Sequence, residues 1–162
     1  MNKKIESAFN RQINAEYYSA YLYLAMSAFF ESQNLKGMAH WMRAQAGEEQ
    51  NHARKFYDFI HDRGGRVKLT AIDAPPADWS SPAAAFNEVY KHECKVSALI
   101  HDLVDLAAKE KDHPAANFLQ WFVSEQVEEE AQAAQIAGKL GEVGDNKGLA
   151  FMFDAELGKR GS

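Results

Sequence analysis

The amino-acid sequence predicts an all-α protein built as a four-helix bundle with a short fifth helix. Three observations support this fold class. Proline and glycine are sparse, at 4 and 10 of 162 residues, so the segments between them are long. Each long segment repeats apolar residues at steps of three and four, as a helix with one buried face requires, and one long loop divides the segments into two pairs. The length and a hydrophobic content of 46% suit a single domain over residues 1–162.

Five helical segments follow from this pattern in chain order. They span about residues 4–33, 36–63, 83–111, 114–140 and 146–157. Tight turns at 34–37 and 111–114 join the first two segments and the next two, and Pro114 suits the first turn of a helix. Such short connections make each pair antiparallel. The last segment carries the apolar run Leu-Ala-Phe-Met-Phe at 149–153, which we expect to pack against the bundle or against symmetry mates.

The connection at about 64–82 is expected to be an extended crossover loop. Its sequence, GGRVKLTAIDAPPADWSSP, has two glycines, three prolines and no helical period. Nineteen residues can span about 60 Å at about 3.3 Å each, whereas a helix of about 28 residues is about 42 Å long. The loop can therefore run the length of the bundle, which favours two antiparallel hairpins joined end to end over simple up-down-up-down topology.

Charge and cysteine content argue against several classes of function. A net charge of −5, a pI of 5.7 and the lack of a basic cluster give no support for binding nucleic acid or an anionic membrane. The sequence has no run of 18 or more apolar residues and no apolar leader core, so we expect a cytoplasmic protein that does not enter a membrane. Cys94 is the only cysteine, which excludes an internal disulfide and a thiolate-based metal site.

Polar residues interrupt the apolar stripe midway along each of the four long segments. They are Glu16 in the first, Glu49 and His52 in the second, Glu93 in the third, and Gln126 and Glu129 in the fourth. Their spacing repeats, because the interval from Glu16 to Glu49 equals the interval from Glu93 to Gln126. One constant offset relates the two halves, and it also relates the two tight turns. Two similar hairpins would therefore bring the six side chains to one level inside the bundle.

Two other polar residues on the stripes are left out of this predicted site. Gln45 does not follow the repeat, since the same offset leads from it to the apolar Phe122. Ser27 is small enough to fit within an apolar core. The predicted site therefore keeps only the six residues that share the repeat.

Four buried carboxylates need a positive partner, because removing even one from water costs several kcal/mol. No lysine or arginine interrupts the middle of these stripes, whereas two divalent cations would balance four negative charges. Oxygen-rich ligands with one imidazole favour iron or manganese, and zinc would fit without redox chemistry. The alternative is a layer of protonated or hydrated polar side chains without metal.

Four stretches of the sequence carry a family resemblance. They are NAEYYSAYLYLAMS with Glu16 and Tyr23, AGEEQNHARKF with Glu48, Glu49 and His52, YKHE with Glu93, and NFLQWFVSEQVEEE with Gln126 and Glu129. Together they resemble the non-haem bacterial ferritins over nearly the whole chain. The resemblance implies a ferritin-like bundle, self-assembly into a hollow shell of usually twenty-four subunits, and iron storage. It also implies a ferroxidase, which oxidises Fe(II) with dioxygen or peroxide.

The resemblance also implies roles for individual residues. Glu16, Glu49 and His52 would hold one iron, and Glu49, Glu93 and Glu129 a second, with Glu49 as the bridge. Gln126 would be a neutral hydrogen-bonding group beside the second iron. A third iron position would use Glu48, Glu125 and Glu128 and would share Glu129. Tyr23 matches a site-adjacent tyrosine and is a candidate electron donor alongside Trp121, although core packing is the preferred explanation for Tyr23.

Departures from related families define the alternatives. Bacterioferritins and rubrerythrins carry a second Glu-x-x-His motif where this sequence has Gln126-x-x-Glu129, and Gln50 stands where bacterioferritins have a haem-binding methionine. Haem is therefore not expected. A di-iron peroxidase or oxidase of the rubrerythrin or bacterioferritin kind is one alternative. A structural or signalling bundle that binds a partner protein without metal is the other.

Overall fold

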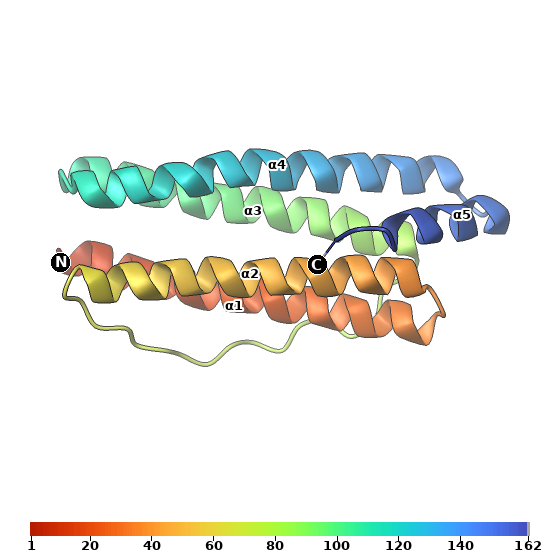
Figure 1. Ribbon diagram of the computed structural model, residues 1–162, viewed down its shortest axis with the longest axis horizontal. Helices are drawn as coiled ribbons and strands as arrows, with labels where there is room; N and C mark the ends of the chain where they lie inside the picture. The colour runs from red at the N-terminus through yellow and green to blue at the C-terminus, as the bar shows by residue number, and fades with distance from the viewer. Residues whose placement is uncertain (162) are drawn as a thin grey trace.

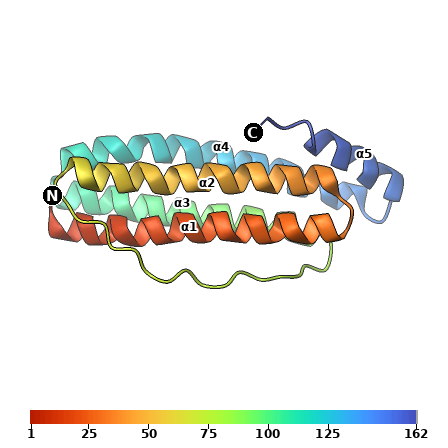
Figure 2. The same ribbon diagram turned by 60° about the horizontal axis from the view of Figure 1, so that its bottom comes forward.

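The computed structural model describes residues 1–161, and within them it contains five helices and no strand (Figures 1 and 2). The helices are α1 (Lys3–Ser32), α2 (Lys36–Asp62), α3 (Pro82–Lys109), α4 (His113–Val143) and α5 (Lys147–Leu157). The predicted all-α class is confirmed. Helix α4 runs beyond the expected end at 140, because it stops only at Gly144, whose φ of 54° a glycine adopts without strain. No described helix has the length and apolarity needed to span a membrane.

The two hairpins end their first helices in the same way. Asn34 after α1 and Lys111 after α3 are the non-glycine residues with positive φ, at 58° and 54°. Their separation equals the offset between the two halves of the sequence repeat. In both turns the chain therefore takes one left-handed residue to reverse its direction between antiparallel helices.

Residues 63–81 run along the whole length of the bundle, as the sequence predicted (Figures 1 and 2). Two asparagines on α1 hold this crossover to the bundle. Asn10 donates to the carbonyl of Arg66 at 3.0 Å, and its Oδ1 accepts from the backbone N–H of Lys68 at 2.6 Å. Asn14 donates to the carbonyl of Ala71 at 2.9 Å. Among the residues that the structure describes, the crossover has no neighbouring strand with which to form backbone hydrogen bonds, and the side-chain amides of α1 bond some of its backbone groups instead.

The core consists of two apolar clusters with a polar layer between them. One cluster lies towards α5 and includes Phe30, Met42, Phe86 and Ile136. The other lies towards the N-terminus and includes Phe9, Phe56, Ile100 and Leu119. On every long helix the predicted polar residues fall in the gap between the two clusters. Apolar packing on both sides therefore fixes the level of the polar layer.

Side-chain caps begin four of the five helices. Asn2, Ser81, Asp112 and Asn146 each accept a hydrogen bond from a backbone N–H in the first turn that follows. Helix α2 is the exception, since Leu35 has no side chain that can cap it. Its first-turn N–H groups need a partner from elsewhere in the fold.

Asp154 of α5 supplies that missing cap. Its carboxylate accepts hydrogen bonds from the backbone N–H groups of Gly37, at 3.2 Å, and Met38, at 2.8 Å. The helices meet so closely that a Cβ on Gly37 would overlap the carbonyl oxygen of Asp154. Leu157 is buried in the same contact. Helix α5 is therefore seated on the start of α2.

A methyl group at position 37 should push α5 off its seat. We expect Gly37→Ala to destabilise the protein by about 1–3 kcal/mol, because the new Cβ meets backbone that cannot move aside. Gly47→Ala is the matched control on the same helix, since a Cβ there meets no atom within 4 Å. That control should be neutral or stabilising by up to about 1 kcal/mol. Thermal denaturation of both variants measures the difference, and equal midpoints would contradict this close contact.

Candidate metal centre

The polar layer brings together side chains from four helices. All six residues with the repeated spacing are buried in it: Glu16, Glu49, His52, Glu93, Gln126 and Glu129. On α2 and α4 the two residues are three positions apart, which places both on one face of the helix. Helices α1 and α3 add one carboxylate each.

Two groups of potential ligand atoms share one carboxylate. Glu16, Glu49 and His52 form the first group, and Glu49, Glu93 and Glu129 form the second. Within each group the ligand atoms lie within 4.8 Å of one another. Since a carboxylate has two oxygen atoms, Glu49 can serve both groups at once. The arrangement can hold two cations side by side, with the same ligand sets that the sequence resemblance implied.

A third group lies on the outer side of the centre. His52, Glu125 and Glu129 also bring one ligand atom each within 4.8 Å of one another. The His52 ring divides its contacts, with Nδ1 3.2 Å from Glu49 and Nε2 3.9 Å from Glu125. Because the Glu125 side chain is 28% exposed, this group opens towards solvent, whereas the first two groups are closed.

Two acids expected at the third position do not belong to that group. Glu128 is exposed on α4, and Glu48 forms an ion pair with Arg160 at 2.7 Å. Glu48 is nevertheless near the centre, since its charge contributes to raising the pKa of Glu129, after the larger effects of burial and of Glu93. The assignment of Glu48 and Glu128 as ligands of a third cation therefore stays a prediction.

Neutral donors orient the carboxylates of the centre. Gln126 donates through Nε2 to Glu93 at 3.1 Å and to the Ser97 hydroxyl at 3.2 Å. The Tyr23 hydroxyl donates to the other oxygen of Glu93. Tyr23 is fully buried, so it packs in the core and also contacts the site. Both predicted neighbours of the ligands thus act on the same carboxylate.

Two further glutamines hold the other carboxylates, and the sequence reasoning missed both. Gln45 is fully buried and donates to Glu129 at 2.6 Å and to Glu49 at 3.3 Å. Gln12 donates to Glu16 at 2.8 Å. Gln45 was excluded because it breaks the repeat that relates the two halves. A signal was present within the first hairpin, since each glutamine stands one helical turn, four positions, before a ligand glutamate.

Burial shifts the proton affinities in this layer. Desolvation, followed by the charge of neighbouring glutamates, raises the pKa of Glu16 and Glu49 well above the usual range. Desolvation also raises the pKa of Glu93, and it raises the pKa of Glu129 to about 7. Without a cation, the four carboxyl groups cannot all be ionised near neutral pH.

The ligands fit a pair of divalent cations. Among the described residues, no lysine or arginine forms an ion pair with any of the four buried glutamates. The Oε2 atom of Glu16 is buried and has no hydrogen-bond partner. A buried carboxylate oxygen without a donor is costly unless a cation lies beside it. Charge and hydrogen bonding therefore both favour cations in this layer.

Known proteins resemble this chain over its whole length. A family model described as "Ferritin-like domain" matches residues 6–143. A bacterial non-heme ferritin from Bacteroides fragilis is 46% identical over 160 residues, which cover 99% of each chain. One from Staphylococcus saprophyticus is 39% identical over 99% of this chain and 96% of its own.

Solved structures give the same result. An open pore ferritin from the hyperthermophilic archaeon Archaeoglobus fulgidus superposes with a TM-score of 0.98 and 53% identity over 99% of each chain. A humanized archaeal ferritin gives 0.99 and 51% over 100% of this chain and 99% of its own. Family, fold and buried carboxylate layer agree, and the chain belongs to the ferritin family.

Proposed function

We propose that the buried centre is a ferroxidase site that oxidises Fe(II) for storage as hydrated Fe(III) oxide. Iron storage is the function that membership of the ferritin family indicates. The observation that carries the proposed site is the pair of ligand groups that share Glu49. Each Fe(II) ion gives up one electron, so two adjacent ions deliver two electrons to dioxygen or peroxide in one encounter. Hard carboxylate ligands favour the product Fe(III) over Fe(II) as the charge rises.

In this proposal the protein supplies geometry and charge. Glu16 and His52 hold one iron, Glu93 and Glu129 hold the other, and Glu49 bridges them. Glutamine amides keep the carboxylate oxygens in place without adding positive charge, which leaves the negative charge of the layer for the iron. Fixed ligands of this kind need little reorganisation when the charge of the iron increases.

The third group would receive a further iron ion between the centre and the solvent. Glu125 and Glu129 are the carboxylates that lie together there beside the His52 ring, and Glu48 and Glu128 are the additional predicted ligands. We place this ion on the route between the oxidation site and the store. The openness of the group supports that role, since an ion can enter or leave it without crossing the apolar core.

Tyr23 is better placed than Trp121 as an auxiliary electron donor. Its hydroxyl is hydrogen-bonded to Glu93, a carboxylate that can take up the phenolic proton when an electron leaves. Trp121 lies edge-on against His52, with ring centroids 5.4 Å apart, but the Lys55 ammonium lies 4.3 Å from its ring centroid. A positive charge there stabilises the neutral indole and opposes loss of an electron.

The alternatives have less support. A bundle without metal would have to keep several of the four buried carboxyl groups protonated near neutral pH, since burial raises the pKa of each. A peroxidase or oxidase of the rubrerythrin or bacterioferritin kind is disfavoured by Gln126 in the place of a ligand glutamate. Haem does not enter the proposal, since Gln50 is an exposed glutamine.

Removal of an inner ligand should abolish fast oxidation. We expect Glu49→Ala and His52→Ala to slow it by about a hundredfold or more, because loss even of supporting contacts at metal sites costs about 10–100-fold. Glu125→Ala and Glu128→Ala should change only the iron stoichiometry and later turnovers. Stopped-flow absorbance after mixing Fe(II) with apoprotein in air measures this, with Glu130→Ala as the control. Undiminished fast oxidation in Glu49→Ala would disprove the site.

Cation binding should expel protons in a pH-dependent way. At about pH 6 the Glu129 carboxyl, whose pKa is about 7, keeps its proton in the apoprotein, whereas at about pH 8 it has lost it. Zn²⁺ should therefore release up to about one proton more per subunit at pH 6 than at pH 8, as measured by pH-stat titration. Glu129→Gln should remove most of this difference and Glu130→Gln should not. Equal release from the native protein at both pH values would contradict the role of Glu129.

Storage requires a hollow assembly, which one bundle cannot form by itself. We propose a shell of twenty-four subunits in the cytoplasm. The exposed apolar side chains Leu149, Phe151 and Met152 on α5 support contact with other subunits. Since each subunit has a mass of 18.2 kDa, the shell should elute in size-exclusion chromatography at roughly 440 kDa. Elution at the mass of a single subunit would rule out storage in a shell.

A further inference from the structure

The C-terminal tail, residues 158–161, contacts α2 through the side chain and the carbonyl of Arg160. The Arg160 guanidinium forms an ion pair with Glu48 at 2.7 Å, stacks on the Trp41 ring with its Cζ 4.5 Å from the centroid, and donates to the Trp41 carbonyl at 3.3 Å. The carbonyl of Arg160 contacts the His40 ring at 2.7 Å. The Arg160 side chain is only 16% exposed. The positive charge of Arg160 thus lies next to the Glu48 carboxylate.

Glu48 faces the outer group of ligands. It lines a cavity of about 450 Å³ together with His52, Trp121 and Glu125. Two of these residues belong to the third group of potential ligands. The Glu48 side chain therefore lies at the rim of the proposed third iron position, and one of its carboxylate oxygens is taken by the guanidinium of Arg160.

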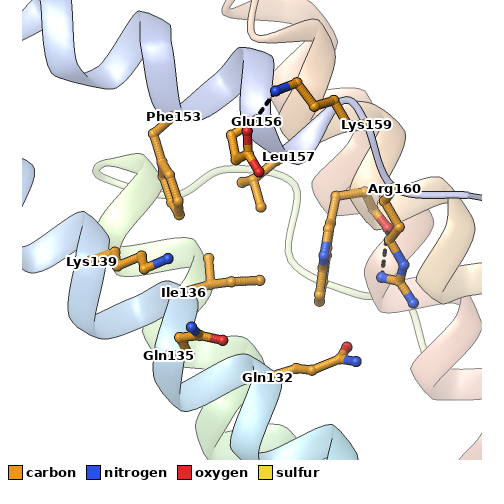
Figure 3. A pocket seen from close by; sticks show the side chains of 10 residues that line it. Gln132, Gln135, Ile136, Lys139, Phe153, Glu156, Leu157, Lys159 and Arg160 are labelled. Carbon is orange, nitrogen blue, oxygen red and sulfur yellow. Dashed lines mark hydrogen bonds and ion pairs between the residues drawn. The ribbon is translucent and has the colours of Figure 1, made fainter.

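The Arg160 end of the tail can leave α2 while the seat of α5 stays in place. The seat of α5 consists of Asp154, Gly37 and Leu157, all of which precede the tail or lie outside it. A cavity of about 380 Å³, which Trp41 of α2 also lines, separates the tail from Gln132, Ile136 and Lys139 of α4 (Figure 3). The backbone N–H groups of Lys159 and Arg160 donate to the carbonyls of Glu156 and Leu157, so the start of the tail stays attached to α5 when the Arg160 side chain leaves α2. Glycines at 158 and 161 flank the residues that would move, and glycine allows the backbone to adjust.

We propose that Arg160 is a built-in competitor for the third cation, which binds with Glu48 as a ligand only when the C-terminal tail detaches. The inference rests on the proposed function, because it concerns the outer iron position of that site. A guanidinium 2.7 Å from one oxygen of Glu48 reduces the negative charge that the carboxylate offers to an ion, and it repels an ion bound at the other oxygen. The competition weakens binding at the outer position and leaves the two inner positions unaffected. A weakly held outer ion passes on to the store, and the tail returns to α2.

Calorimetric titration of Zn²⁺ into the assembled apoprotein tests this competition. Arg160→Gln should bind the weakest zinc ion about threefold to tenfold more tightly than the native protein, because a partly exposed ion pair opposes binding by about that factor. The two tighter ions should bind as before. Lys159→Gln is the matched control. It also removes one positive charge from the tail, but Lys159 pairs with Glu156 and not with Glu48. That control should leave all three affinities unchanged.

A double substitution separates competition from a general loss of positive charge. In a Glu48→Gln background, Arg160→Gln should no longer tighten the outer ion, because the carboxylate for which the two cations compete is absent. Hydrogen–deuterium exchange gives a second readout. Saturation of the native protein with Zn²⁺ should speed exchange at residues 158–161 and leave that at 147–157 unchanged.

The outcomes distinguish this inference from the function on which it depends. Three zinc ions that bind equally well in Arg160→Gln and in the native protein would overturn the competition and leave the ferroxidase proposal intact. Tightening that persists in the Glu48→Gln background would also overturn it. If native protein and variants all bound no zinc in the polar layer, the proposed function and the competition would fail together.

Discussion

Burial of four carboxylates between two apolar half-cores is the constraint on which the rest of the structure depends. The two apolar clusters lie on either side of the layer, so packing fixes where the glutamates stand but does not supply the charge they need. Desolvation then raises the pKa of every one of them. The fold thus stores an unfavourable interaction at one level of the bundle. In our proposal two divalent cations relieve it, which would make affinity for metal a consequence of the packing.

The hydrogen-bond donors to the buried carboxylates are neutral, so they do not reduce the affinity of these carboxylates for cations. An arginine or lysine would satisfy the carboxylates and compete with iron. Amides from Gln12, Gln45 and Gln126 and the hydroxyl of Tyr23 instead orient single oxygen atoms and leave the net charge in place. The absence or presence of a positively charged side chain also distinguishes the two proposed inner iron positions from the proposed outer one. Where a cation of the chain does appear, on Glu48, it lies at the open rim, and in our proposal it makes binding there weaker and exchange easier.

Contacts of α5 connect the end of the chain to this centre. Asp154 completes the hydrogen bonding at the start of α2, a helix that has no cap of its own. That seat directs the following residues back along α2, so that Arg160 reaches Glu48, which is 112 positions earlier in the sequence. A terminal segment that looked like a simple apolar patch therefore stabilises one helix end and also places a positive charge at the rim of the outer group.

The five helices, the crossover and the six residues of the polar layer could be predicted from the sequence. Helical periodicity and an internal repeat are both visible in the spacing of residues along the chain. The sequence also indicated the ligand sets through a family resemblance. The contact of Gln45 with Glu129, the cap from Asp154 and the pairing of Glu48 with Arg160 follow only from the folded structure. These depend on which side chains meet across helices, where distance in sequence carries no information. Glu48 shows the difference most clearly, since its position in the sequence suggests a metal ligand, whereas in the folded chain it pairs with the Arg160 guanidinium.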